Sequence, residues 1–471
     1  MDSLLYGLAA HPALPAHLVD RLIADADADA EVAWRLADRA DLSRDQVRAL
    51  AARSRQASIH LAYGGLLRAE DVDPALRPEA ALALLDEGRG DVSWAPRLAG
   101  DPVVARRVGL AGCRGLPAAV EEVLAADREP EVVAELALWT ASPALLTRLA
   151  VHPDAAVRRA AATNEATPPE LLAALLDDDP GIRQAAVCNP ATPGEAAARY
   201  ADDPSPVLRQ ALAERPDLPA AVYERFAADP VPWVRGNLAE NAAIGEPLIR
   251  RLAGDDTYDV RRRLAHHPHV PLDVLARLAA ATRIGPTLLP RIATATADEV
   301  PRLAGSPVPA LRMLLARRRD LPDAVRDALA DDRDAKVAAS IAPHPGLSER
   351  RLGALLDRFG TRVAAAVAAN PGTPAALLER LAAQQPPAGK ALRAVARHPH
   401  ATAAALLRCL ADPKARPLAA AHPALPADVL TGLLGGDDPQ TVEAAAANPS
   451  LPAGQVESLL GKAVERRRSR S

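Results

Sequence analysis

The feature that most constrains this chain is a sequence pattern that returns about every 26 residues. Each return is marked by an anchor residue, usually Asn or His, that stands at an expected helix exit, often just before Pro. In the most regular stretch the anchors are 25, 26, 26 and 26 residues apart: Asn164, Asn189, Arg215, Asn241 and His267. A fixed period between about 20 and 50 residues is typical of stacked-repeat proteins. It therefore predicts an all-α solenoid and not a single closed core.

Each period is long enough for two short helices. In the unit that ends at Asn189, Thr167 is the expected N-cap of the first helix and Pro168 its first residue. Four leucines between 171 and 176 follow the spacing of one buried helical face. Asp179 is the expected N-cap of the second helix, with Pro180 next to it. Some units leave room for only a 3-10 turn.

The same pattern extends in both directions from this stretch. Further anchors are expected at His11, Arg39, Arg89, Arg114, Trp139, Arg318, His344, Asn370, His398, His422 and Asn448. Units around Tyr63 and Ala293 are degenerate. The sequence predicts one continuous solenoid of about eighteen two-helix repeats over residues 1–461, most regular at 139–270 and 344–460. Residues 462–471 form a basic tail that is expected to be disordered.

The repeated Asp-Pro, Val-Arg, Ala-x-Asn-Pro, Thr-Pro and Leu-Leu elements resemble those of the leucine-rich repeat variant family. The resemblance implies a right-handed superhelix of two helical layers, related to HEAT and armadillo arrays. Some members carry a cysteine-ligated iron–sulfur segment before the repeats. This chain has no Cys before Cys113 and no CxxC pair, so no cofactor is expected. The resemblance implies no defined activity.

Composition narrows the range of partners. The chain has 56 Lys and Arg against 60 Asp and Glu, a net charge of −4, which argues against a general nucleic-acid coat protein. No apolar run approaches about 18 residues, so no membrane span is expected. The N-terminus lacks a basic segment followed by an apolar one, which argues against a secretory signal. Cys113, Cys188 and Cys409 form no disulfide framework, and the expected location is the reducing cytoplasm.

Histidine is the first candidate for metal chemistry. Five anchors are histidines: His11, His267, His344, His398 and His422. Equivalent positions in stacked helices lie about 10 Å apart, too far to share a metal. We therefore expect the anchors to cap the ends of their own helices, each contributing about 1 kcal/mol. His266, His267 and His269 are clustered without an acid or Cys at ligand spacing, and no metal site is expected.

Arginine is the main candidate for partner contact. One row of arginines precedes the anchors by six residues: Arg158, Arg183, Arg209, Arg235 and Arg261. The simpler interpretation pairs each with an acidic turn residue of its own or a neighbouring unit. The functional interpretation is a basic stripe that follows a phosphate backbone or an acidic peptide. Residues 250–327 contain 14 Arg against 9 Asp and Glu, so we expect partner contacts at Arg235, Arg261 and Arg262.

No catalytic signature is present in the sequence. It contains no glycine-rich phosphate loop, nucleophile elbow or zinc-protease helix. Four tryptophans occupy different phases of the repeat, which favours packing or partner contact over catalysis: Trp34, Trp94, Trp139 and Trp233. Apolar residues of the first and last units (Leu4, Leu5 and Leu8; Val456, Leu459 and Leu460) need cover if the chain is to stay monomeric.

The sequence therefore predicts a non-enzymatic intracellular scaffold. It would bind a protein or peptide along an extended surface, act as a monomer and have no contact with membranes. The alternative is a nucleic-acid-binding HEAT-like protein, of DNA-repair type, that uses the Arg-rich central repeats.

Overall fold

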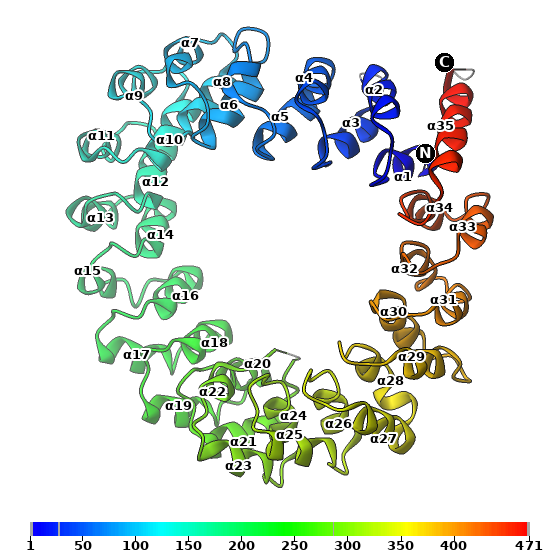
Figure 1. Ribbon diagram of the computed structural model, residues 1–471. Helices are drawn as coiled ribbons and strands as arrows, with labels where there is room; N and C mark the ends of the chain where they lie inside the picture. Colours follow the sequence, from blue (N-terminus) through cyan, green and yellow to red (C-terminus); the bar gives the residue numbers. More distant parts are fainter. Residues whose placement is uncertain (1–2, 27–28, 286, 469–471) are drawn as a thin grey trace. The chain divides into compact units, whose positions relative to one another are not determined.

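The chain folds as a repeating series of helices. The computed structural model describes residues 3–26, 29–285 and 287–468, with side chains of the last helix described as far as Ala463. Within these residues the protein contains thirty-five α-helices, two short 3-10 helices and no strand (Figure 1). The predicted all-α repeat fold is confirmed.

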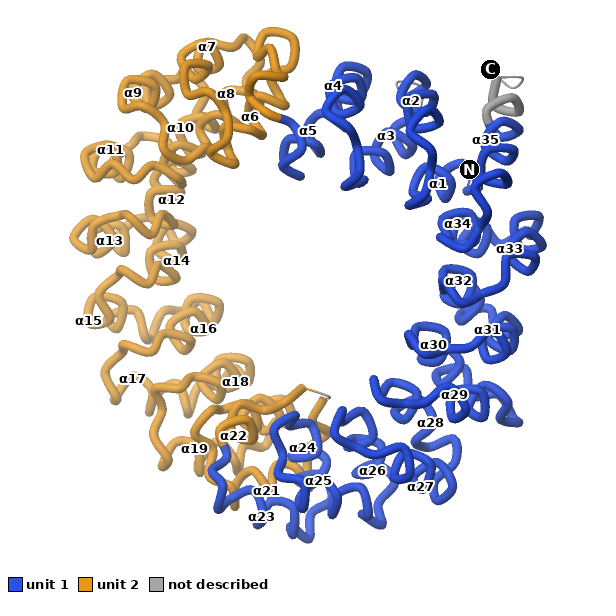
Figure 2. Tube along the Cα trace, in the orientation of Figure 1, with its two compact units in different colours: residues 1–67, 295–471 blue, residues 68–294 orange. Residues whose placement is uncertain are grey.

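The helices are grouped into two compact units (Figure 2). Unit 1 combines residues 1–67 with 295–471, and unit 2 contains residues 68–294. Both boundaries fall beside repeats that are degenerate in sequence, around Tyr63 and Ala293. At the second of these, α22 is only four residues long.

The helices of unit 2 are η1 (Ala69–Asp71), α6 (Pro78–Asp86), η2 (Val92–Trp94), α7 (Ala95–Ala99), α8 (Val104–Ala111), α9 (Ala118–Ala125), α10 (Pro130–Trp139), α11 (Pro143–Leu149), α12 (Ala155–Thr163), α13 (Pro169–Leu175), α14 (Pro180–Cys188), α15 (Gly194–Ala198), α16 (Pro206–Glu214), α17 (Ala220–Phe226), α18 (Pro232–Glu240), α19 (Glu246–Leu252), α20 (Tyr258–Leu264), α21 (Leu272–Ala281) and α22 (Pro290–Ala293).

The helices of unit 1 are α1 (Ser3–Ala9), α2 (Ala16–Ala24), α3 (Ala30–Ala37), α4 (Arg44–Arg53), α5 (Arg55–Tyr63), α23 (Glu299–Ala304), α24 (Pro309–Leu315), α25 (Asp323–Ala330), α26 (Ala335–Ile341), α27 (Glu349–Phe359), α28 (Thr361–Ala368), α29 (Ala375–Ala382), α30 (Gly389–Arg397), α31 (Ala403–Cys409), α32 (Arg416–Ala420), α33 (Ala427–Leu433), α34 (Pro439–Ala446) and α35 (Ala453–Arg468).

In a regular repeat, the first helix follows a turn and the second helix ends at the anchor. The second helices pack against one another in series, α8 to α20 by even numbers in unit 2 and α24 to α34 in unit 1. Their contact faces are rich in fully buried alanine, such as Ala161, Ala186 and Ala213. Small side chains let helix backbones approach closely, so the second helices form the tighter layer. Leucines of the first helices, such as Leu172 and Leu175, fill the space between the layers.

The anchor side chains connect each repeat to the one before it. The Asn189 amide nitrogen donates to the carbonyl oxygens of Ala162 and Asn164, at 2.9 and 2.8 Å. Its amide oxygen accepts from the backbone N–H of Ala191 at 3.0 Å. Equivalent donor pairs are made by Asn164, Asn241, Asn370 and Asn448. We predicted that each anchor caps the end of its own helix, and this was wrong, because the anchor side chain donates to the preceding repeat. The buried carbonyls that need donors are those at the end of the preceding repeat's helix.

At some anchor positions an arginine replaces the Asn and forms an additional ion pair. Arg215 donates to the carbonyls of Val187 and Asn189 at 2.7 and 3.0 Å, and its other nitrogens pair with Asp217. Arg39 and Arg318 are likewise paired with an Asp two residues later. A buried cation requires a counter-charge, so an Arg anchor is accompanied by an acid that an Asn anchor does not need.

Three positions predicted from the repeat are shifted by one residue. Thr140 occupies the buried slot that we assigned to Trp139, and Cys113 occupies the one assigned to Arg114. Thr167 does not cap the following helix, which begins at Pro169 with Pro168 at the N-cap position. Its hydroxyl donates to the Ala161 carbonyl at 2.6 Å and so satisfies the end of the preceding helix.

The first and last repeats of unit 1 pack against each other. Helix α1 lies on α34 and α35, and Leu5, Leu8, Val456 and Leu460 are buried. The anchor series continues across this contact, where His11 Nε2 lies 2.9 Å from the Asn448 carbonyl oxygen. Each terminal repeat therefore supplies the cover that the other needs.

The basic tail was expected to begin at residue 462. Helix α35 instead continues to Arg468, so most of this segment is helical. Residues 469–471 lie outside the described part of the chain.

We predict that Asn189→Ala lowers the free energy of unfolding by about 2–3 kcal/mol. The substitution removes two donors and leaves two buried carbonyls of the preceding repeat unsatisfied. Urea unfolding followed by circular dichroism and fluorescence checks it. Gln184→Ala, an exposed position on the same helix, is the control. A loss below about 0.5 kcal/mol would mean that the anchor bonds contribute little net stability.

We also predict that Gly7→Leu separates α1 from α34. A Cβ at Gly7 would lie within clash distance of the Glu443 carbonyl oxygen and of Ala446 Cβ. Hydrogen–deuterium exchange of both helices should therefore accelerate. Gly181→Leu is the control, because a Cβ there meets nothing within 4 Å. Unchanged exchange in α1 and α34 would contradict the packing described for the terminal repeats.

Candidate interaction surfaces

Arg235 belongs to a set of ion pairs between neighbouring repeats, the arginine ladder. Its Nε and Nη2 atoms donate to the two carboxylate oxygens of Asp255 at 2.7 and 3.0 Å. Nη1 donates to the Asp229 carbonyl at 2.7 Å, and only 13% of the side chain is exposed. The ladder consists of Arg107–Asp127, Arg158–Asp178, Arg209–Asp229, Arg235–Asp255 and Arg312–Asp332.

Every pair in the ladder joins residues twenty positions apart. Four of the five carboxylates also accept a backbone N–H two residues later, as Asp229 does from Val231 at 2.8 Å. Asp178 accepts that of Asp179. The hydrogen bond from Arg158 lowers the pKa of Asp178 below its ordinary value. Bidentate Arg–carboxylate pairs have fixed geometry, so the ladder holds successive repeats in register.

Arg261 and Arg262, the other predicted contact residues, are placed differently. Arg261 has the ladder position but lacks an acid twenty residues later, where Ala281 stands. Its guanidinium donates to the Asp255 carbonyl instead. Arg262 is 43% exposed and lies 3.1 Å from Asp259 on the same helix. A contact role for Arg235, Arg261 and Arg262 stays a prediction, and the last two are the more accessible.

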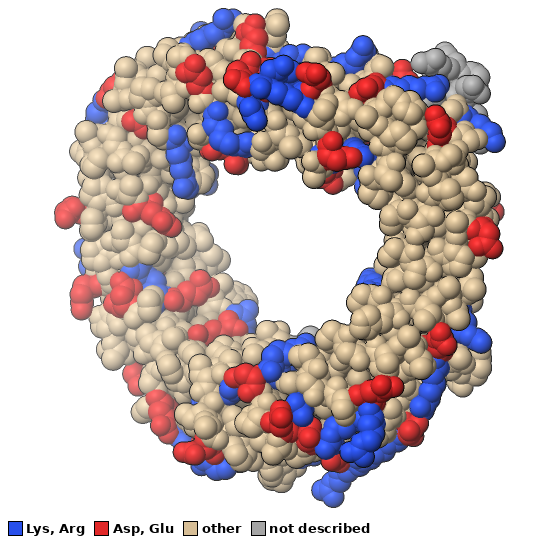
Figure 3. Space-filling model, in the orientation of Figure 1, with Lys and Arg blue, Asp and Glu red and all other residues tan. Residues whose placement is uncertain are grey.

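At least seven of the fourteen arginines of residues 250–327 are ion-paired. Arg250 binds Glu246 and Asp273, and Arg326 binds Asp323 and Asp327. A second row pairs with acids of the preceding repeat: Arg148 with Glu122, Arg199 with Asp177, Arg225 with Asp202 and Arg251 with Glu224. Part of the positive charge of this segment is therefore engaged in intramolecular ion pairs. Figure 3 shows acidic and basic side chains intermixed on the face in view.

The histidine anchors act as neutral hydrogen-bonding groups. His267 Nδ1 accepts from the backbone N–H of His269 at 3.1 Å, so Nε2 carries the proton and donates to the Asn241 carbonyl at 2.9 Å. Burial lowers the pKa of His267 below the usual value near 6.5. The described residues contain no group of three or more His, Cys, Asp or Glu side chains placed to hold a metal.

The cysteines are not activated as nucleophiles. Burial raises the pKa of the Cys113 thiol to about 12 and that of Cys409 to about 11. Both remain protonated at neutral pH, whereas a reactive cysteine needs a lowered pKa. All three cysteines are free thiols in the described structure.

Exposed aromatic side chains lie on the second helices of unit 2. Trp139 on α10 is 41% exposed, Trp233 on α18 is 51% exposed and Tyr258 on α20 is 43% exposed. Trp139 Nε1 donates to Glu135 at 2.7 Å, and the Arg114 guanidinium lies 5.1 Å from the centre of its ring. These contacts hold a large apolar ring at the surface in one orientation.

A pocket of about 720 Å³ opens beside Trp139. It is lined by the ends of α8, α10 and α12 and by the turns that follow them, including Cys113, Leu116 and Leu138. Thr140 on its wall donates to Glu121 at 2.9 Å. The pocket is more apolar than polar, so it suits an apolar side chain of a bound polypeptide. Sequence reasoning missed it because its walls come from three repeats.

Comparisons with known proteins give similarity to solved structures only. No protein-family model matches the chain, and no curated protein is similar to it in sequence. The chain is similar to a solved structure described as a leucine-rich repeat variant with a novel repetitive protein structural motif. Sequence identity is 24%, over 48% of this chain and 87% of that chain, with a TM-score of 0.32. The repeat architecture is therefore established by the helices and ladders described above. No described helix is long and apolar enough to cross a membrane.

We predict that His398→Asn makes stability less sensitive to pH between 7 and 5. Burial lowers the folded-state pKa of His11, His267, His344 and His398 below the unfolded value near 6.5. The unfolded chain therefore binds more protons as the pH falls, and the free energy of unfolding decreases. Asn fills the same slot in other repeats without titrating. Urea unfolding at pH 5, 6 and 7 measures the slope.

The reciprocal substitution Asn370→His provides the control, because it adds a titrating group at an equivalent buried slot. Asn370→His should make the free energy of unfolding fall more steeply between pH 7 and 5, whereas His398→Asn should make it fall less steeply. Equal slopes for both variants and the parent chain would show that the anchor histidines do not set the pH dependence.

Proposed function

We propose that this protein is a non-enzymatic scaffold that binds a protein or peptide partner along the second helices of its repeats. The observation that carries the proposal is the set of exposed aromatic rings on α10, α18 and α20. Exposed Trp and Tyr are typical anchors of protein interfaces, where a few such residues supply most of the binding energy. The repeat-helical architecture supports the same conclusion, because stacked helices offer extended binding surfaces.

The anchor bonds and the arginine ladder support this proposal because they make the second-helix surface rigid. Anchor bonds join second helices to their neighbours, and five of these junctions also have a bidentate ion pair. A surface that is ordered before binding loses little conformational entropy when a partner docks. The pocket beside Trp139 adds a place where one apolar side chain of the partner would be enclosed.

The alternative, a nucleic-acid-binding repair-type protein, has less support. It relied on the Arg-rich central repeats, and at least seven of the fourteen arginines of residues 250–327 are paired with Asp or Glu. The proposal includes a monomer that acts in the cytoplasm. Free, unactivated thiols are compatible with such a reducing compartment.

Photo-crosslinking tests which helical layer binds. A photoreactive phenylalanine analogue replaces Val207, which is 49% exposed on second helix α16, or Val123, which is 55% exposed on first helix α9. We expect the partner from native cells to be captured at 207 and not at 123. Trp233→Ala should weaken binding of the captured partner about tenfold or more, as loss of an aromatic anchor does.

Two results would count against the proposal. Capture at 123 alone, or equally at both positions, would place the partner away from the second helices. An unchanged affinity of Trp233→Ala together with Trp139→Ala would show that the exposed rings are not contact residues.

A further inference from the structure

The second helices of unit 1 carry a row of exposed positive charges, the cation row. It consists of Lys336, Arg362, Lys390 and Lys414, each eight residues before an anchor. All four side chains are exposed. Lys336, Arg362 and Lys390 lie in α26, α28 and α30, and Lys414 lies in the turn before α32. At the same position unit 2 has residues of varied type: Ala156, Gly181, Val207, Trp233 and Asp259.

The cation row is not neutralised in the way the arginine ladder is. Among the described residues, none of its four charged groups has an ion pair or a side-chain hydrogen bond. Asp334 accepts from the backbone N–H of Lys336 at 2.7 Å and not from its ammonium group. Asp412 similarly accepts from the Lys414 backbone N–H at 3.0 Å. The Arg362 guanidinium lies 5.5 Å from the centre of the Phe359 ring, which leaves its charge uncompensated.

Neighbouring residues strengthen the positive charge. Arg393 and Arg397 lie one turn apart on α30, and Arg333 stands just before α26. Helices α26, α28, α30 and α32 contain no Asp or Glu at all. Their remaining residues are mostly alanine and valine, so little bulk separates the charges from an approaching chain.

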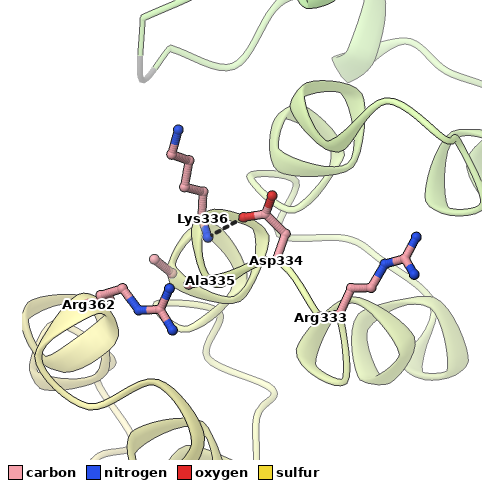
Figure 4. A pocket seen from close by; sticks show the side chains of 6 residues that line it. Arg333, Asp334, Ala335, Lys336 and Arg362 are labelled. Carbon is pink, nitrogen blue, oxygen red and sulfur yellow. Dashed lines mark hydrogen bonds between the residues drawn. The ribbon is translucent and has the colours of Figure 1, made fainter.

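A shallow pocket of about 540 Å³ lies between the first two members of the cation row. Lys336 from α26 and Arg362 from α28 line it, with Arg333 and Asp334 from the turn before α26 (Figure 4). Positively charged side chains from two repeats thus border one recess, where an anionic group would be within reach of both.

From these contacts we infer that the cation row binds an extended acidic peptide segment. This inference rests on the proposed function and names the chemistry of the partner at unit 1. Stacked helices lie about 10 Å apart, and a peptide in the extended polyproline II conformation advances about 3.1 Å per residue with three residues per turn. Every third side chain therefore lies on the same face, and a carboxylate at every third residue would meet successive cations. Four repeats correspond to a segment of about twelve residues.

The surroundings favour a peptide over a nucleic acid. Single-stranded nucleic acid is typically held by aromatic side chains that stack on its bases. Between residues 333 and 414 the only aromatic side chain besides histidine is Phe359, which is buried. The cation row stops after four repeats, because the next repeat has the uncharged Gln440 at this position. On the same helix, Glu443 pairs with Arg35 at 2.7 Å.

Fluorescence anisotropy with the full chain tests the inference. The probe is a labelled twelve-residue peptide with Glu at every third position and Ser and Ala between. We expect saturable binding that weakens between 50 and 200 mM salt. The quadruple variant K336E/R362E/K390E/K414E should bind at least about tenfold more weakly, because four exposed attractions become repulsions.

The matched control reverses four exposed arginines on first helices, R97E/R277E/R302E/R350E, for which the described residues show no ion pair. It has the same total charge as the quadruple variant and should bind the probe within about twofold of the parent chain. Circular dichroism confirms folding. If the quadruple variant unfolds, K336Q/R362Q replaces it and should weaken binding about threefold or more.

Failure to bind the acidic probe, or equal affinities of the quadruple variant and the control, overturns the inference. Tighter binding of a twelve-nucleotide oligothymidine or of a twelve-base-pair duplex, lost in the quadruple variant, also overturns it in favour of nucleic acid. The proposed function is tested separately, because the crosslinking positions 123 and 207 lie in unit 2. Peptide binding without capture at 207 would support the cation row as a peptide-binding surface and would contradict the proposed role of the exposed aromatic side chains.

Discussion

The hydrogen bonds from each anchor to the preceding repeat are the interaction on which the rest of this structure depends. A helix that ends in a buried layer leaves carbonyl groups without donors, and an unsatisfied carbonyl there is strongly unfavourable. Asn, His and Arg each supply donors at the required place, as Asn241 does for Ala213 and Arg215. Because the donor belongs to the next repeat, the requirement of one helix fixes the position of its neighbour.

The same logic separates structural charge from available charge. Arg209 and Arg235 are held by two-point bonds to acids of the following repeat, so they define the stacking and have little left to offer a partner. Lys336 and Arg362 occupy equally regular positions but make no ion pair with a described residue. Specificity in such a protein therefore resides in positions where the repeat pattern continues and its internal partner is missing.

Much of this fold was predictable from the sequence, because the period and the anchors are local signals. The exact residue at each anchor position was less predictable. Thr140 rather than Trp139 is buried, because one added residue in α10 changes which side chain faces inward. The direction of the anchor bonds and the twenty-residue separation of the arginine ladder depend on contacts between repeats. The basic surface was expected in residues 250–327 because a count of charges ignores pairing. The structure also leaves positive charge without an ion pair on α26, α28 and α30, outside that segment.

The packing of α1 on α34 also has a consequence for how the chain is made. His11 and Asn448 are separated by 437 residues, so this contact cannot form until Asn448 has been synthesised. Unit 2 is continuous in sequence and is available to fold earlier, whereas the first repeats emerge with Leu5 and Leu8 still unpartnered. Contacts of such long range are slow to form, and exposed apolar surface is prone to aggregation meanwhile. Until unit 1 is completed, Leu5 and Leu8 therefore lack the cover that α34 and α35 provide in the folded chain.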